Sequence, residues 1–406
     1  MKVLVLGAGG QGGPCASIME KDPNVEEVRV YDLDAKVANA VKEKIGSDKI
    51  VAGTVDATKT AEIVKIAEGV DVIMDFVMPW MARYVMEAAL QVGANYVNSA
   101  FDAPFWDELV DGKPLSYSKE FEEKGLTALL GCGQTPGFIN VLIRQQTDKM
   151  DEVESIKIRV ATKDLTQDQY GELTVPWDPG WSPFQALKDY SDSSACFENG
   201  KYGFVPPLAG LERYHFDDPI GDALVGHHSH EEAYSLPRTI GKGIQYCDFK
   251  FVVPYQAAAL VTLGLASQEE IDVKGTKIKP IDVATSVLPK PGNSFLEPES
   301  LDFDYMDKYM YESMAAEVIG KKDGKRVGYK VYCPKMYSPA QEIYDLFGAV
   351  LVGVALPAVT GAKQIAQGDS KKGIIFAEEL DPAKFIELFK ATGYPYEWNV
   401  TEMELL

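Results

Sequence analysis

The sequence predicts an α/β protein in which a doubly wound parallel sheet is followed by a second, α+β domain with a mixed or antiparallel sheet. Strand-like and helix-like segments alternate over residues 1–140. A glycine-rich turn follows the first apolar run. From about residue 151 the pattern changes to alternating, half-buried strands. We expect domains at 1–140 and 141–340, and C-terminal helices over 341–406 that pack back on the first domain.

The first element is a buried strand over Val3–Leu6, which leads directly into a glycine motif with the spacing G-x-G-x-x-G. One glycine makes the tight turn, another lets the backbone approach a pyrophosphate, and the third lets the next helix pack on the strand. This is the dinucleotide-binding turn of a Rossmann fold. The residues expected to contact the cofactor are Gly7, Ala8, Gly9, Gly10, Gln11 and Gly12.

A second strand, Val28–Tyr31, ends at Asp32, twenty residues after Gly12. A carboxylate at that offset binds the adenosine ribose hydroxyls. The next residues, Leu33 and Asp34, bring no arginine and one further negative charge, which would repel a 2′-phosphate. The sequence therefore favours NAD over NADP. The alternative is a glycine turn in an α/β protein that binds no nucleotide.

The rest of this domain continues the alternation of strands and helices. Ligands of such sheets bind beyond the carboxyl ends of the strands, so contacts are expected from Asp56, Ala57, Val77, Met78, Pro79 and Ser99. Asp56 has two interpretations, a helix cap or a contact to the adenine edge. Helices are predicted at Asp34–Ile45, Thr58–Ala67 and Trp80–Gln91, and strands at Ile50–Val55, Val70–Val77, Asn95–Asn98 and Leu126–Leu130.

The second half carries more β-like pattern, followed by helix-like segments near its end. Predicted strands are Ser155–Ala161, Gly226–Arg238, Ile244–Val253, Lys274–Lys279 and Lys325–Cys333, and predicted helices are Phe347–Ala366 and Pro382–Thr392.

Composition excludes some classes of partner. A net charge of −21 argues against nucleic acid and anionic membrane surfaces, because phosphate groups require clustered lysine and arginine. No segment resembles a signal peptide or reaches membrane-spanning length without polar interruption. The five cysteines are scattered and predict buried thiols, so we expect a cytoplasmic protein.

Three of the four histidines fall within His227–Glu232. In a strand, His228, His230 and Glu232 would share one face and could bind a metal. Alternatively, His230 and Glu232 act in acid/base chemistry or contact the substrate. A third possibility is purely structural, with imidazoles that hydrogen-bond locally. Hydride transfer needs no metal, and none is predicted.

Other candidates also have two interpretations. Asp102, past the fifth strand, could act as a base or steer an ammonium group, or it could cap the segment Ala103–Val110. Arg238 could bind a substrate carboxylate with its planar fork, or form a surface ion pair. Trp177 and Trp181 could shield the site from water, or pack in the core or an interface.

These motifs resemble the saccharopine dehydrogenase superfamily. The resemblance rests on the glycine motif, Asp32 and four further segments. It implies a nicotinamide-dependent oxidoreductase that acts on a carbon–nitrogen bond, a site that includes Asn140, and a homodimer formed through the second sheet. Thr135 and Asn140-Val141 depart from the pattern of many relatives. The four segments are Tyr96-Val97-Asn98-Ser99, Gly131-x-x-x-Thr135-Pro136-Gly137-x-x-Asn140, Trp181-Ser182 and His230-x-Glu232-x-x-x-Leu236-Pro237-Arg238.

Three functions follow. The first is a dehydrogenase of an amino acid or opine, resembling saccharopine and lysine dehydrogenases. The second is a polyamine-pathway reductase that joins an aldehyde to an amine, resembling carboxynorspermidine dehydrogenases. The third is a dinucleotide-binding protein without catalytic activity.

Overall fold

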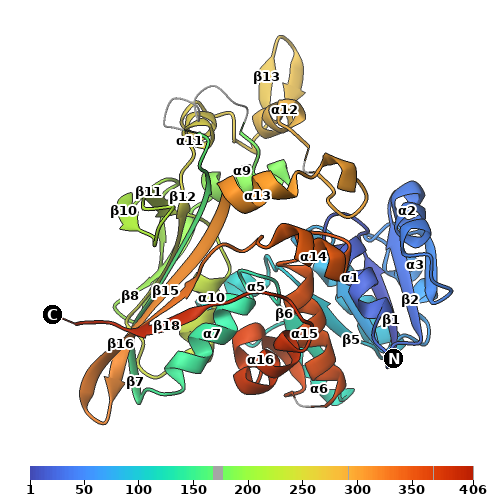
Figure 1. Cartoon of the computed structure of the whole chain (residues 1–406), viewed down its shortest axis with the longest axis horizontal. Helices are drawn as coiled ribbons and strands as arrows, with labels where there is room; N and C mark the ends of the chain where they lie inside the picture. The colour runs from blue at the N-terminus through green and yellow to red at the C-terminus, as the bar shows by residue number, and fades with distance from the viewer. Residues whose placement is uncertain (168–176, 291, 369, 406) are drawn as a thin grey trace.

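The computed structural model describes residues 1–167, 177–290, 292–368 and 370–405. Two large sheets stand side by side (Figure 1). Helices α5 (Phe105–Asp111), α7 (Phe138–Thr147) and α10 (Glu232–Ile240) lie between them, and α10 contacts both other helices.

The first sheet is parallel throughout, with the strand order β17-β6-β5-β4-β1-β2-β3. The order reverses between β4 and β2 around β1, so the carboxyl edge at β1 is the expected ligand crevice of a doubly wound sheet. The predicted fold class is confirmed. The strands are β1 (Lys2–Leu6), β2 (Glu27–Asp32), β3 (Ile50–Thr54), β4 (Val72–Asp75), β5 (Asn95–Asn98), β6 (Thr127–Leu130) and β17 (Gly373–Phe376).

Strand β1 shows why the sheet is central. Val3 and Val5 pack into one hydrophobic core, whereas Leu4 and Leu6 pack into another, and all four side chains are fully buried. A strand covered on both faces is apolar at every position. The covering elements of this half are α1 (Gly12–Glu20), α2 (Ala35–Ile45), α3 (Thr60–Ala67), η1 (Pro79–Met81), α4 (Ala82–Val92) and α6 (Ser118–Glu123).

The second sheet is mixed, as predicted. Its main path is β10-β11-β12-β7-β15-β16-β18, with β8 and β9 attached beside β12. Only the β12–β7 pair is parallel among the pairs described. The strands are β7 (Glu152–Asp164), β8 (Ser194–Glu198), β9 (Lys201–Val205), β10 (Glu212–His215), β11 (Asp222–His227), β12 (Tyr246–Val252), β15 (Met310–Lys322), β16 (Lys325–Cys333) and β18 (Asn399–Glu402).

One predicted strand is wrong. The segment Gly226–Arg238 is a strand only to His227, where β11 ends, and after a short turn it becomes helix α10. The period-2 alternation of polar residues there reflects a turn, and Pro237 lies inside the helix. Tertiary contacts explain this outcome, because Thr239 and Arg238 bond to groups on distant segments.

The predicted helix Phe347–Ala366 is likewise divided. Helix α14 (Ala340–Phe347) ends at Gly348, which has a left-handed φ of 74°, and α15 (Ala355–Ala366) begins seven residues later. Further elements are α9 (Pro183–Ser191), α11 (Tyr255–Thr262), β13 (Ile271–Val273), β14 (Thr276–Ile278), α12 (Pro280–Val287), η2 (Pro298–Ser300), α13 (Phe303–Tyr309), η3 (Ala377–Glu379) and α16 (Pro382–Lys390).

The C-terminal segment enters both halves of the molecule. Helix α15 packs on α1, β4 and β5, and β17 pairs with β6 in the first sheet. Strand β18 pairs with β16 in the second sheet. The segment after residue 340 therefore supplies strands to both sheets in addition to the expected helices.

Two further expectations concern sulfur and membranes. All five cysteines are buried and unpaired, as predicted. Among the described residues, no helix has the length and apolar character needed to cross a membrane.

Candidate functional site

The glycine motif forms a cradle at the carboxyl end of β1. Gly7 has a φ of +86°, and a Cβ at Gly12 would lie 1.7 Å from the carbonyl oxygen of Gly7, so the turn requires both glycines. A Cβ at Gly9 or Gly10 would meet no atom within 4 Å. The backbone therefore faces open space where the fold places a pyrophosphate, at the start of α1.

Asp32 closes one side of this cradle. Its Oδ2 accepts a hydrogen bond from the Ala8 amide at 2.7 Å, and its Oδ1 accepts one from the Asp34 amide at 2.9 Å. The adjacent Leu33 side chain is 76% exposed. The carboxylate lies beside the glycine turn, where it fits the hydroxyls of an adenosine ribose.

Gln11 connects the cradle to the C-terminal part of the chain. Its Nε2 donates to the Leu351 carbonyl at 2.9 Å, and its Oε1 accepts from the Ala355 amide at 3.0 Å. Gln11 thus satisfies the first amide of α15 with its side chain. It positions the glycine turn, and this contact between residues 340 positions apart had no local signal in the sequence.

Other predicted cofactor residues lie at neighbouring strand ends. Asp56 accepts from the amide and hydroxyl of Thr58, and these bonds lower its pKa. These bonds form a local turn just before α3, which agrees more closely with the helix-cap interpretation of Asp56 than with a contact to the adenine edge. Ala57 follows Asp56 there, Val77 and Met78 follow β4, Pro79 begins η1, and Ser99 follows β5.

A buried polar chain beneath this edge was missed by sequence analysis. The Tyr96 hydroxyl donates to Oδ2 of Asp75 at 2.7 Å and accepts from Nδ2 of Asn98 at 3.1 Å, while Oδ1 of Asn98 accepts from the Gly131 amide. Burial raises the pKa of Asp75 to about 6. The chain joins the ends of β4, β5 and β6. The sequence feature that accompanies this chain of hydrogen bonds is the presence of polar residues within otherwise apolar strands.

His230 and Glu232 form the central pair of the second domain. Nδ1 of His230 lies 2.5 Å from Oε2 of Glu232, and the Thr135 hydroxyl donates to the other oxygen of that carboxylate. Glu231 accepts a hydrogen bond from the Phe101 amide at 3.2 Å. Loops after β5 and β6 therefore contact the start of α10, which brings this pair to the carboxyl edge of the nucleotide-binding sheet.

The charges around His230 are predominantly negative. Burial alone would lower the pKa of His230, but the charges of Glu232 and Glu231 and the bond to Glu232 raise it to about 9. Burial raises the pKa of Glu231 to about 7, and it raises that of Asp189 well above its ordinary value. The imidazole is consequently protonated at neutral pH and can donate a proton.

Aromatic rings line this cluster. The His230 ring stacks on Phe249, with centroids 4.2 Å apart. Trp181 is 37% exposed and meets Phe251 edge-on, whereas Trp177 is buried and packs against Tyr190. Trp181 thus has the exposure needed to contact a ligand, and Trp177 belongs to the core.

The strand face considered as a possible metal site, His228, His230 and Glu232, does not form, because β11 ends at His227 and α10 begins at Glu232. His228 lies on the chain before the turn, packs edge-on against Tyr190, and has no hydrogen-bond partner within the described ranges. His230, Glu231 and Glu232 do place ligand atoms within 4.8 Å of one another. Since Nδ1 of His230 is engaged with Glu232, the geometry is that of an ion pair.

Two predicted site residues have structural contacts in this arrangement. The Arg238 guanidinium donates to the carbonyls of Glu108, Leu109 and Lys113 around the end of α5. Asn140 is fully buried; it accepts from the Gly137 amide and donates to Glu378. Asn140 is thus engaged inside the protein, whereas the Arg238 side chain remains exposed while its guanidinium bonds to these carbonyls, and the predicted role of each residue in substrate binding stays a prediction.

The contacts of Asp102 decide neither for the helix cap nor for the contact to an ammonium group. Its Oδ1 accepts from the amide of Ala103, and its Oδ2 lies 3.8 Å from Nζ of Lys188 on α9. Lys188 also pairs with Asp192 at 2.9 Å. Asp102 therefore joins the loop after β5 to the second domain.

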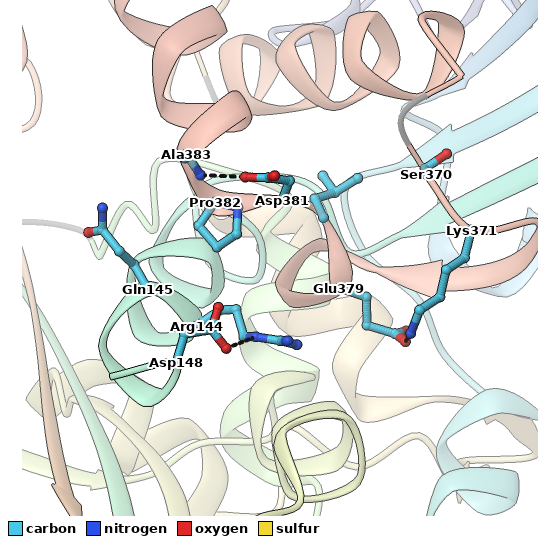
Figure 2. A pocket seen from close by; sticks show the side chains of 10 residues that line it. Arg144, Gln145, Asp148, Ser370, Lys371, Glu379, Asp381, Pro382 and Ala383 are labelled. Carbon is cyan, nitrogen blue, oxygen red and sulfur yellow. Dashed lines mark hydrogen bonds and ion pairs between the residues drawn. The ribbon is translucent and has the colours of Figure 1, made fainter. Parts of the chain in front are cut away.

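A separate open hollow of about 570 Å³ lies between the end of α7 and the start of α16 (Figure 2). Of its charged side chains, Arg144 pairs with Asp148 at 2.6 Å and Lys371 with Glu379 at 3.4 Å, and Asp381 caps α16 by accepting from the Ala383 amide. None of the glycine-turn or His230 residues lines it. It is therefore not part of the candidate site.

Comparisons with known proteins agree with this geometry. Residues 3–129 match the saccharopine dehydrogenase NADP binding domain, and residues 133–394 match the saccharopine dehydrogenase C-terminal domain. A carboxyaminopropylagmatine dehydrogenase from Synechocystis is 24% identical over 97% of this chain and 96% of its own length. A carboxynorspermidine synthase from Vibrio alginolyticus is 24% identical over 100% and 98%.

Solved structures share the fold. Saccharopine dehydrogenase (L-Glu forming) from Saccharomyces cerevisiae matches with a TM-score of 0.68 at 15% identity, over 99% of this chain and 100% of that chain. The homospermidine synthase from Legionella pneumophila, solved with NAD, matches with a TM-score of 0.65 at 15% identity, over 98% and 91%.

Proposed function

The chain belongs to the saccharopine dehydrogenase family and is an NAD(P)-dependent oxidoreductase acting on a carbon–nitrogen bond, and we propose that its product is a secondary amine joining an amino-acid carbon chain to a polyamine. The observation that carries this proposal is the buried acidic cluster around His230. Asp189, Glu231 and Glu232 outnumber the single imidazolium there.

An excess of buried carboxylates favours a cationic ligand. Buried charges are stable when they are paired, and His230 pairs mainly with Glu232. Glu231 accepts the Phe101 amide and also lies 3.4 Å from Nδ1 of His230, and Asp189 accepts a hydrogen bond from Gln185, so three carboxyl groups share one imidazolium. Ammonium groups of a ligand would supply the further positive charge, and the rings of Phe249 and Trp181 suit the methylene segments between such groups. Polyamines combine these two features.

The full-length relatives support the same substrate class. The two named above match this chain and their own lengths almost completely, and their names describe carboxylated polyamine derivatives. By contrast, the match to alpha-aminoadipic semialdehyde synthase of Mus musculus covers 49% of this chain and 21% of that protein.

The chemistry follows from this site. An aldehyde and a primary amine condense with loss of water to give an imine. The glycine turn and Asp32 would hold the reduced nicotinamide cofactor, which would supply the hydride that the imine carbon needs. Protonated His230 holds the proton that the nitrogen needs, and Glu232 stabilises the imidazolium before transfer. Phe249 beside the ring limits access of water.

We further propose that NAD is preferred to NADP. Asp32 holds a carboxylate at the ribose position, and neither Leu33 nor Asp34 supplies a cation for a 2′-phosphate.

The test is a panel assay that follows NADH and NADPH oxidation at 340 nm. An amino-acid semialdehyde is offered with 1,3-diaminopropane, putrescine, agmatine or spermidine, and saccharopine and L-lysine are tested for oxidation in the reverse direction. We expect turnover with a polyamine and NADH. Oxidation of saccharopine or lysine alone would instead make the enzyme an amino-acid or opine dehydrogenase. Cofactor binding without any turnover would mean that the protein is catalytically silent.

A further inference from the structure

Glu312 is a buried carboxyl group that the chemistry above does not use. It lies near the start of β15, the residue is 8% exposed, and no lysine, arginine or histidine pairs with it among the described residues. Its carboxylate accepts a hydrogen bond from Nε2 of Gln134 at 2.5 Å. Burial raises its pKa to about 7, although that hydrogen bond acts in the opposite direction.

Gln134 is fixed on its other side as well. A Cβ at Gly353 would lie 1.8 Å from Oε1 of Gln134, so the amide packs directly against the backbone there. Gly353 lies between Leu351 and Ala355, the two residues that Gln11 of the glycine turn contacts. The amide therefore spans the space between Glu312 and the segment that supports the cofactor turn.

The loop after β6 connects Glu312 to the His230 pair. Gln134 donates to Glu312, and the next residue, Thr135, donates to Glu232, the partner of His230. Two consecutive residues of one loop thus bond to both carboxylates. This loop stands at the carboxyl end of β6, the edge where the fold binds its ligands.

A buried carboxylate without a cation is costly unless a ligand supplies one. We propose that Glu312 is a second ammonium-binding group of the active site, which takes a distal amine of the polyamine, and that Gln134 is its positioning residue. This inference rests on the proposed function. It divides substrate recognition between the His230 cluster, at the reacting nitrogen, and Glu312, at the far end of the amine.

The test compares Glu312→Gln with Glu317→Gln in the full-length enzyme. Glu317 is on the same strand and bonds to the Tyr214 hydroxyl at 2.8 Å, away from Gln134. Steady-state kinetics use the amine that reacts best in the panel, and calorimetry measures spermidine binding with NADH present. We expect Glu312→Gln to raise KM and the spermidine Kd by roughly tenfold, as for a lost charged contact, with NADH affinity and kcat little changed.

The pH dependence provides a readout that a structural role would not move. Binding of a cation should strengthen as Glu312 ionises, so the Kd for spermidine should fall between pH 6 and pH 8. This fall should be smaller in Glu312→Gln. The titratable groups that face Glu312 are the phenols of Tyr394 and Tyr396, whose pKa values lie above this range. Glu231 also titrates near pH 7, and its contribution to the pH dependence of the spermidine Kd should be the same in both variants.

The possible outcomes separate the two proposals. Turnover with a polyamine but equal KM, Kd and pH dependence in the two variants would overturn the role of Glu312. No turnover with any polyamine would overturn the proposed function itself. If Glu312→Gln fails to fold, Gln134→Ala removes the positioning bond, and an unchanged spermidine Kd in that variant would equally refute the inference.

Discussion

Nδ1 of His230 and Oε2 of Glu232 lie 2.5 Å apart, and the second oxygen of that carboxylate accepts the Thr135 hydroxyl. The carboxylate belongs to the first residue of α10, and the hydroxyl belongs to the loop after β6. The carboxylate that raises the pKa of the candidate acid is therefore also the group that bonds to the first domain.

Replacing Glu232 with glutamine should impair catalysis at alkaline pH. The variant loses the charge that raises the pKa of His230, so the imidazole deprotonates at lower pH. We expect kcat to fall roughly 100-fold at pH 8, within the range of general acid catalysis, with the alkaline limb of the pH–rate profile moved toward neutrality. Glu231→Gln should move that limb less. An unmoved limb in Glu232→Gln would exclude His230 as the acid.

Replacing Asp32 with serine should change cofactor choice. The variant removes a charged acceptor for the ribose hydroxyls, a contact of about 1.5–3 kcal/mol, so KM for NADH should rise at least roughly tenfold. KM for NADPH should fall relative to it, because repulsion of the 2′-phosphate is removed. Leu33→Ala, which changes an exposed side chain next to it, serves as the control. An unaltered NADH/NADPH ratio would argue against the ribose contact.

Replacing Arg238 with alanine should affect stability more than substrate binding. Its guanidinium bonds to three carbonyls near the end of α5, and the side chain is largely exposed, so a loss of about 1 kcal/mol is expected. Chemical denaturation measures this loss, and KM for the amine should stay within about twofold. A large rise in KM at unchanged stability would restore the sequence-based role in carboxylate binding.

Stability should decrease as pH rises from 6.5 to 9. The pKa of His230 is about 9 in the folded chain and 6.5 without the fold, so the folded state holds an extra proton across this interval. The contribution is complete below pH 6.5 and is lost as pH passes 9, with a magnitude of up to about 3 kcal/mol. Urea unfolding at several pH values measures it, and His230→Gln should reduce the slope. An equal slope in that variant would place the effect elsewhere.

Local pattern predicted the nucleotide-binding half well. Apolar runs such as Val3–Leu6, followed by glycine or acidic residues, specify a buried parallel strand and its turn from neighbouring residues alone. The second half depends more on distant contacts. Residues 228–232 alternate like a strand, yet contacts of Glu231 with Phe101 and of Glu232 with Thr135 accompany a turn and a helix.

The candidate site likewise has one part that neighbouring residues predict and another part that depends on distant contacts. The cofactor turn is encoded in six consecutive residues, so it could be located from sequence. Glu312, Gln134 and Gly353 come from three distant segments and carry no shared pattern, and their proximity exists only after both sheets have formed. For Arg238, residue chemistry predicted a contact to a substrate carboxylate, and the hydrogen bonds to backbone carbonyls that the structure adds come from a distant segment with no shared pattern.

The position of β17 also constrains when the protein can fold during synthesis. The ribosome releases the glycine turn early, but the edge of β6 gains its neighbour only when Gly373–Phe376 emerges, and β16 gains its own with Asn399–Glu402. Neither sheet is complete on a nascent chain that stops before residue 373. The nucleotide-binding half, although encoded first, must therefore wait for a strand that is synthesised only shortly before the last strand of its partner.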